Sequence, residues 1–125
     1  MNVEIRYPDM RRNLISAVSY LANSLDKPVI EVRNSEGLLK QYFDFDMAIN
    51  VIFDDVRVAE NPQDCIGVVL RNAQEAEALQ VLVEQLEILL RDDIDTLDEE
   101  TLATESFKAM VKAAVVAERT LLAVD

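Results

Sequence analysis

The chain has 125 residues, of which half are apolar, and its 24 acidic and 12 basic side chains give a formal charge of −12. This length suffices for one hydrophobic core, so we expect a single domain over residues 1–125, and the apolar content excludes an intrinsically disordered chain. The negative charge repels phosphate groups, so we expect neither nucleic-acid binding nor attachment to an anionic membrane.

The expected compartment is the cytoplasm. Cys65 is the only cysteine, and it fits a reducing environment because it cannot form an internal disulfide. The first residues show no basic patch followed by a long apolar run, and no run reaches the ~20 apolar residues of a membrane span.

The N-terminal part is predicted to hold a short strand or arm and then a helix. Residues 2–7 alternate between apolar and polar side chains, and Pro8 and Asp9 suit the first turn of a helix. The apolar positions that follow have helical spacing and form one stripe: Leu14, Ile15, Val18, Leu21, Ala22 and Leu25. Pro28 favours an end to this helix, because the residue before a proline avoids the helical conformation.

A small β-hairpin or short sheet is predicted near residues 28–45. Val29, Ile30 and Val32 form a strand pattern, residues 34–37 are typical of a turn, and residues 38–45 return as the partner strand. A lone hairpin is only marginally stable in water, so we expect this one to pack on the helices.

Two helix start signals follow the hairpin. Asp44 or Asp46 can cap a short helix that reaches residue 54. Asn61 and Pro62 indicate the start of a further short helix, because asparagine favours the N-cap and proline the first helical position.

The longest helix is predicted from Asn72 to Arg91. Its inward positions have helical spacing: Ala76, Leu79, Leu82, Val83, Leu86, Leu89 and Leu90. Val81 and Ile88 widen this apolar stripe, which indicates burial on a second side, either in the same core or in a subunit interface.

An acidic connector leads to the last predicted helix. Residues 92–105 contain seven acidic residues and no basic one. Thr104 or Ser106 can cap the final helix, whose apolar stripe begins at Phe107. The elements together predict an α+β fold that is mainly helical, with three longer helices, one or two short ones and the small hairpin.

The usual catalytic side chains and motifs are absent from the sequence. There is no histidine, which removes the common general base and the commonest metal ligand. There is also no paired-cysteine zinc pattern and no glycine-rich phosphate-binding loop. We expect no cofactor, and we interpret Cys65 as a small buried hydrophobic residue rather than a reactive thiol.

Carboxylates remain the one source of chemistry. If residues 46–54 are helical, Asp46, Asn50 and Asp54 follow at intervals of four and share one face, where their oxygens could hold Mg²⁺. The competing interpretation assigns the aspartates to capping and to the solvent side of a helix whose other face enters the core.

A resemblance accompanies these patterns. The segments Ile52-Phe53-Asp54-Asp55, Asn61-Pro62 and Ile66-Gly67 are similar to a group of small, acidic bacterial proteins without assigned function. The resemblance covers roughly residues 40–90, and it implies a bacterial protein with no catalytic residues to transfer. By analogy, small acidic proteins of this kind are often accessory-gene products or immunity proteins that block toxins.

The first functional hypothesis is a non-enzymatic acidic module that binds a basic partner protein, as an immunity- or antitoxin-type inhibitor does. Residues 63–125 contain fourteen acidic and five basic residues, a net charge of −9, and such a field speeds the encounter with a basic surface. The expected contact surface consists of eight aspartates: Asp44, Asp46, Asp54, Asp55, Asp92, Asp93, Asp95 and Asp98.

Two alternatives remain. One is a structural homo-oligomer, most simply a homodimer sealed by the spare face of the 72–91 helix or of the C-terminal helix. The other is a Mg²⁺-dependent phosphate-ester or nucleotide hydrolase that uses Asp46, Asp54 and Glu84.

Overall fold

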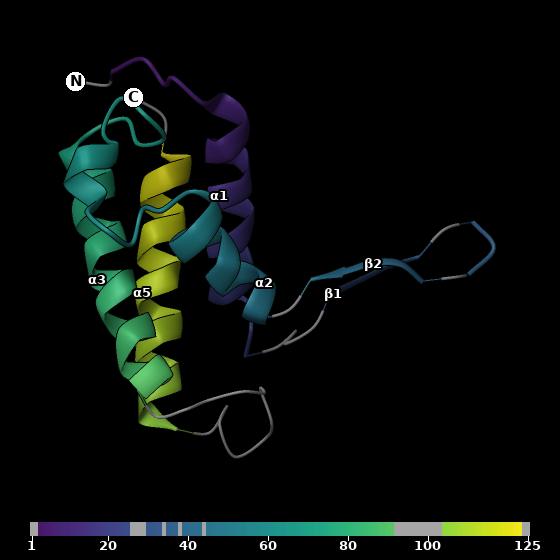
Figure 1. Cartoon of the computed structure of the whole chain (residues 1–125). Helices are drawn as coiled ribbons and strands as arrows, with labels where there is room; N and C mark the ends of the chain where they lie inside the picture. Colours follow the sequence, from purple (N-terminus) through teal and green to yellow (C-terminus); the bar gives the residue numbers. More distant parts are fainter. Residues whose placement is uncertain are drawn as a thin grey trace.

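Three long helices form the body of the protein. The structure, a computed structural model, describes residues 3–25, 30–33, 35–37, 39–43, 45–91 and 104–123, and for residues 30–33 and 39–43 only the backbone. The long helices are α1 (Pro8–Ala22), α3 (Ala73–Arg91) and α5 (Glu105–Leu122). α5 packs against both α1 and α3, and α3 and α5 run in opposite directions (Figure 1).

The starts of these helices follow local signals in the sequence. Pro8 occupies the first turn of α1, as predicted. The Asn72 side chain accepts a hydrogen bond of 3.0 Å from the backbone N–H of Glu75, at the start of α3. Thr104 caps α5 by accepting a hydrogen bond of 3.2 Å from the backbone N–H of Phe107. The predictions of these three starts are confirmed. The side chains of Asn72 and Thr104 satisfy backbone donors that the helices leave free, whereas α1 begins with a proline and has no side-chain cap.

The segment between the hairpin and α3 is less regular than predicted. α2 (Phe45–Asn50) continues into a π-helical turn, η1 (Val51–Asp55), and Asn61 caps a single 3₁₀ turn, η2 (Pro62–Cys65). After η1 the backbone reverses at Arg57, whose φ of 60° lies in the left-handed region. This reversal places both Val56 and Val58 in the core.

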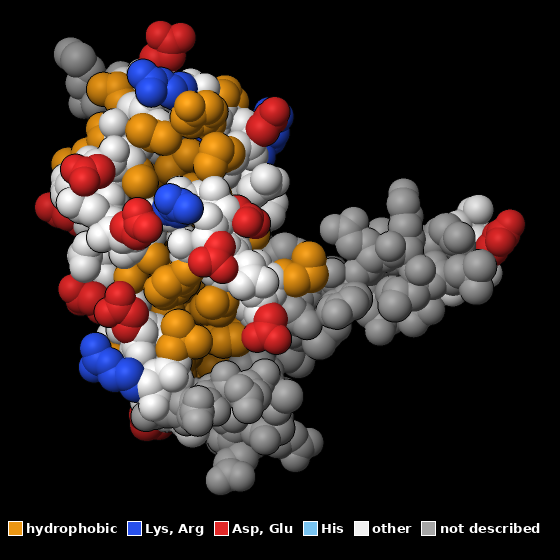
Figure 2. Space-filling model, viewed as in Figure 1, with side chains coloured by type: hydrophobic (Ala, Val, Ile, Leu, Met, Phe, Trp, Pro, Cys, Tyr) orange, Lys and Arg blue, Asp and Glu red, His pale blue; other side chains and the backbone are white. Residues whose placement is uncertain are grey.

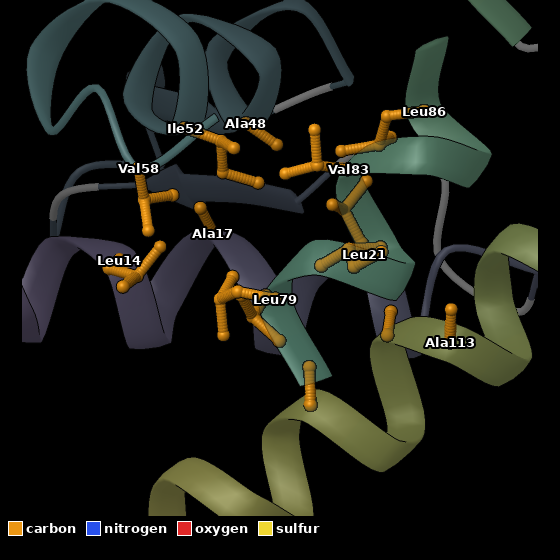
Figure 3. Packing of buried hydrophobic residues seen from close by; sticks show 14 of the residues in the cluster. Leu14, Ala17, Leu21, Ala48, Ile52, Val58, Leu79, Val83, Leu86 and Ala113 are labelled. Atoms are coloured by element: carbon orange, nitrogen blue, oxygen red, sulfur yellow. The ribbon is translucent and has the colours of Figure 1, made fainter. Parts of the chain in front are cut away.

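The core lies where α1, α2 with η1, α3 and α5 meet. Figure 3 shows Leu14 and Ala17 of α1 facing Ile52 and Val58, with side chains of α3 beside them. The largest fully buried side chains include Phe107. Burying one such side chain contributes about 1.5–3 kcal/mol, so these helices are stabilised mainly by packing on one another.

The N-terminal arm joins the loop before α3. The backbone N–H groups of Arg6 and Tyr7 donate to the carbonyls of Gly67 and Val68, at 3.1 and 3.0 Å. Gly67 has a φ of 87°, a conformation that glycine adopts without strain. This junction brings the start of α1 alongside the start of α3.

The predicted α+β class is wrong, and the fold is all-α. Strands β1 (Ile30–Arg33) and β2 (Leu39–Phe43) form an antiparallel two-stranded ladder with Ile30 opposite Phe43. This ladder extends away from the helical body in Figure 1, and the strands make their main contacts with each other. Among the residues whose side chains the structure describes, the core consists of the helices and of the segment between α2 and α3, which gives the all-α class. We expected the hairpin to pack on the helices because a lone hairpin is only marginally stable. Marginal stability does not determine where the hairpin lies relative to the helices.

Candidate functional site

A groove open to solvent runs along the outer side of the α3–α5 pair. Its first part has a volume of about 510 Å³ and its second part about 300 Å³. Ala78, Val81 and Val116 line both parts, so the two parts form one continuous depression. We call it the α3–α5 groove.

Small and apolar side chains form the floor of the α3–α5 groove. Ala78 and Ala113 are each 8% exposed, whereas Val81 and Val116 are 50% and 55% exposed. The two half-exposed valines on neighbouring helices form an apolar surface at the centre of the groove. Val81 was predicted to widen the apolar stripe of this helix, and it lies in the middle of the groove.

Polar and charged side chains border the groove with opposite signs on its two helices. Glu77 of α3 lines the first part together with Arg119 of α5. Lys112 of α5 lines the second part together with Gln85 of α3. The charged side chain that α3 contributes is therefore acidic and those that α5 contributes are basic, and Arg71, just before α3, adds a positive charge at the end of the first part.

A buried ionic cluster fixes one end of the groove. The carboxylate of Glu75 is fully buried and accepts hydrogen bonds from Nη1 and Nη2 of Arg11, at 2.8 and 2.9 Å. It also accepts from Nε and from the backbone N–H of Arg71, both at 2.7 Å. We call Arg11, Arg71 and Glu75 the Arg–Glu–Arg cluster.

The same two arginines hold the carboxyl end of α5. Arg11 Nη2 donates to the carbonyl of Leu121 at 3.0 Å, and Arg71 Nη2 donates to the carbonyl of Ala123 at 2.8 Å. Positive charge at the carboxyl end of a helix is favourable because the last carbonyls carry negative partial charge. The cluster therefore joins α1, the start of α3 and the end of α5 at one point.

The Arg–Glu–Arg cluster keeps Glu75 ionised. Burial alone would favour the protonated carboxyl, but hydrogen bonds from Arg11 and Arg71 and the charge of Arg11 lower the pKa of Glu75 below its ordinary value. Removing one member of such a buried cluster leaves uncompensated charge in the interior. Because Arg71 also lines the groove, the cluster positions one of its walls.

Three of the eight aspartates of the predicted acidic surface lie within the described residues. Asp46, Asp54 and Asp55 are exposed, and they lie on α2 and η1. Five further predicted residues lie outside the described residues: Asp44, Asp92, Asp93, Asp95 and Asp98. Figure 2 shows acidic side chains spread over one face of the helical body, with basic side chains between them.

The proposed metal ligands do not converge. Asp46 lies in the first turn of α2, whereas Asp54 lies in the π-helical turn η1, and the wider turn changes the angular phase between them. Within the described part of the chain, no group of three or more cysteine, aspartate or glutamate residues is placed to hold a metal ion. Asp46, Asp54 and Glu84 therefore do not form the predicted set of ligands.

Cys65 is half-buried at the end of η2. Burial, together with the negative charges of Asp64 and Glu60, raises the pKa of its thiol. The thiol is therefore mainly protonated near neutral pH, which makes it a weak nucleophile. This fits the prediction of an apolar packing role for this residue, although it is not fully buried.

The Arg–Glu–Arg cluster was missed by sequence reasoning. Arg11 has the helical phase of a solvent-facing residue, and Glu75 reads as an ordinary acidic residue of a first helical turn. The signal that could have indicated the cluster was the phase of Glu75, which shares the inward side of α3 with Leu79 and Leu82. A charged residue on an inward face needs a partner, because an unpaired buried charge is very costly.

Comparison with known proteins gives a family but no function. The model of a family described as "Domain of unknown function (DUF7945)" matches residues 5–125. No curated protein and no solved structure gives a significant match. Among the helices of the described residues, none combines the length and apolar character that crossing a membrane requires.

Proposed function

The chain belongs to the DUF7945 family, and we propose that it is a non-enzymatic protein-binding module whose contact surface is the α3–α5 groove. One observation carries this proposal: Val81 and Val116 lie half-exposed at the centre of a continuous groove between two long helices. A groove of this kind accepts the apolar face of another helix. We further propose a cytoplasmic location, which the lone cysteine supports.

The groove is suited to a helix because small side chains form its floor and polar side chains border it. Alanines at positions 78, 109 and 113 leave room for a close approach, and packed helices lie about 8–10 Å apart. The rims carry hydrogen-bonding and charged groups, which fix the register of a partner more than they add affinity.

The test uses a photo-reactive amino acid at position 116. Val116 is replaced by p-benzoylphenylalanine in cells that natively contain the protein, and the proteins that cross-link on illumination are identified by mass spectrometry. Glu87, an exposed residue of α3 that does not line the groove, is replaced in the same way as a matched control. The identified protein is then purified and its affinity for the unmodified chain and for Val116→Asp is measured.

The proposal predicts a species that cross-links from position 116 and not from position 87. Its affinity for Val116→Asp is expected to fall at least tenfold, because the substitution puts a charge against an apolar surface. Equal binding to Val116→Asp, or no cross-linked protein from position 116, would refute the proposal.

The net charge of −12 supports a second contact, with a basic partner, on a surface apart from the groove. Asp46, Asp54 and Asp55 are exposed and do not line the groove. Through this contact the protein would act as an immunity- or antitoxin-type inhibitor of the basic partner. If a basic protein is identified, Asp54→Lys combined with Asp55→Lys should slow its association and flatten the salt dependence, whereas an unchanged rate would exclude these residues.

A further inference from the structure

We infer that the occupant of the α3–α5 groove is the same groove of a second copy of this chain, with α3 of each copy lying on α5 of the other. This inference rests on the proposed function, because it names the partner of the proposed contact surface. The spacing of the exposed residues, the signs of the rim charges and the area that two grooves would bury all support it.

The exposed faces of both helices follow the spacing of helix-bundle interfaces. On α3 the positions that line the groove follow at intervals of four and three residues, Gln74, Ala78, Val81 and Gln85, and the exposed Ile88 continues the series. On α5 the positions Ala109, Ala113, Val116 and Thr120 do the same, and Ala123 follows as the C-cap residue. This alternation keeps one face of a helix against a neighbour over several turns, as in four-helix bundles. Two such faces on neighbouring helices indicate that a further helix pair packs against them.

The rim charges select one arrangement of the two copies. In a symmetric dimer the same surface faces itself about a two-fold axis that passes through the interface. If the axis runs parallel to the helices, α3 of one copy faces α5 of the other, and each residue keeps its level along the helix. If the axis runs across the helices, α3 faces α3 and α5 faces α5.

The parallel axis brings opposite charges together. Val81 and Val116 line both parts of the groove. Glu77 precedes Val81 by four residues and Arg119 follows Val116 by three, so in helices that run in opposite directions both are displaced toward the same end of the groove. The parallel axis therefore sets Glu77 opposite Arg119 of the other copy. The crossed axis sets α3 on α3 and α5 on α5, and so keeps Glu77 away from Arg119 of the other copy.

The area available fits a weak, reversible dimer. α3 has 19 residues and α5 has 18, so the face is roughly 27 Å long at 1.5 Å per residue and about 20 Å wide. Two such faces bury on the order of 1,000 Å² in total, at the lower end of specific interfaces. We expect a dissociation constant in the micromolar range, on the order of 10⁻⁶ M.

The experiment is a charge exchange measured by sedimentation equilibrium. Glu77→Arg and Arg119→Glu are prepared separately, and each is expected to raise the dimer dissociation constant about tenfold, because symmetry places two like-charge contacts in every dimer. Mixing the two variants should give a heterodimer with near-normal affinity. In that heterodimer the arginine introduced into one variant faces the glutamate introduced into the other, so both contacts again join opposite charges. Circular dichroism verifies that each variant is folded.

The matched control is Glu87→Arg, which makes the same charge change on an exposed position of α3 away from the groove. It should leave association unchanged. A concentration-independent monomer at and above about 1 mM, roughly a thousandfold over the expected constant, would overturn the inference. So would dimers whose affinity is the same in Glu77→Arg, Arg119→Glu and their mixture.

The cross-linking experiment separates failure of this inference from failure of the proposed function. A second copy cross-linked from position 116 supports both. A different protein cross-linked from position 116, with a monomeric chain, overturns the second-copy inference and leaves the protein-binding module intact. A monomeric chain that cross-links to nothing from position 116 refutes both.

Discussion

Replacing the buried carboxylate of Glu75 tests the central electrostatic argument. Glu75→Gln keeps the size of the side chain but removes its charge, and it turns one acceptor oxygen into a donor that faces guanidinium N–H groups. A hydrogen bond to a charged group contributes about 1.5–3 kcal/mol, and breaking a buried ion pair by removing one partner costs about 3–5 kcal/mol. Because Glu75 accepts four short hydrogen bonds, we expect the free energy of unfolding to fall by about 3–5 kcal/mol.

This loss is large relative to the total stability of a small domain, about 5–15 kcal/mol. Urea unfolding followed by circular dichroism measures it directly. Glu87→Gln, at an exposed position of the same helix, is the control and should change stability by less than about 0.5 kcal/mol. A change of under about 1 kcal/mol in Glu75→Gln would refute the argument, because surface ion pairs contribute that little.

The pH dependence supplies an independent readout of the same cluster. The pKa of Glu75 is lower in the folded protein than its ordinary value, so the folded state favours the ionised form. Its contribution is fully present above the unfolded pKa and is lost as the pH falls through the folded pKa. The difference in stability between the wild type and Glu75→Gln should therefore be largest near neutral pH and shrink in acid. A stability difference between the two proteins that stays constant from neutral pH to below the folded pKa of Glu75 would show that the carboxylate is not held ionised.

Three smaller predictions concern single residues. Thr104→Ala removes the cap of α5 and should lower the free energy of unfolding by about 1 kcal/mol, measured by urea unfolding; Ser106→Ala, which leaves this cap in place, is the comparison. Arg57→Gly relieves a left-handed backbone and should be neutral or stabilising, whereas Arg57→Val should be destabilising by about 1–2 kcal/mol; equal stabilities would contradict this. The pKa of the Cys65 thiol is raised, so Cys65 should react with iodoacetamide more slowly than glutathione does in mildly alkaline buffer. Unfolding the protein in urea should remove this difference. Equal rates for glutathione and the folded protein would show that the thiol is not protected.

Local signals predicted the parts of the fold that depend on neighbouring residues. Pro8, Asn72 and Thr104 act within one helical turn, so the starts of α1, α3 and α5 were predictable from short stretches of sequence. The inward positions of α3 were also correct, except for Leu90, which is 40% exposed near the end of the helix. The resemblance to acidic bacterial proteins stays a prediction.

Features that depend on distant residues were not predictable in the same way. Arg11 and Glu75 are 64 positions apart, and nothing near either residue indicates the other. The α3–α5 groove was predicted only as a surplus of apolar residues at Val81 and Ile88. The apolar pattern of one helix does not show which part of its surface the neighbouring helices leave uncovered. The α+β class was wrong because strand patterns indicate extended backbone but not whether the strands join the core.

The span of the Arg–Glu–Arg cluster has a consequence for how the protein is made. Arg11 contacts the Leu121 carbonyl across 110 positions of sequence, so a ribosome must translate as far as Leu121 before this contact can form. Until α5 has left the exit tunnel, the apolar faces that α1 and α3 later bury on it remain open to water. Chains with such exposed apolar surface are prone to aggregate. Premature termination upstream of α5 should therefore yield fragments that are cleared by proteases or require chaperones, and not a smaller folded protein.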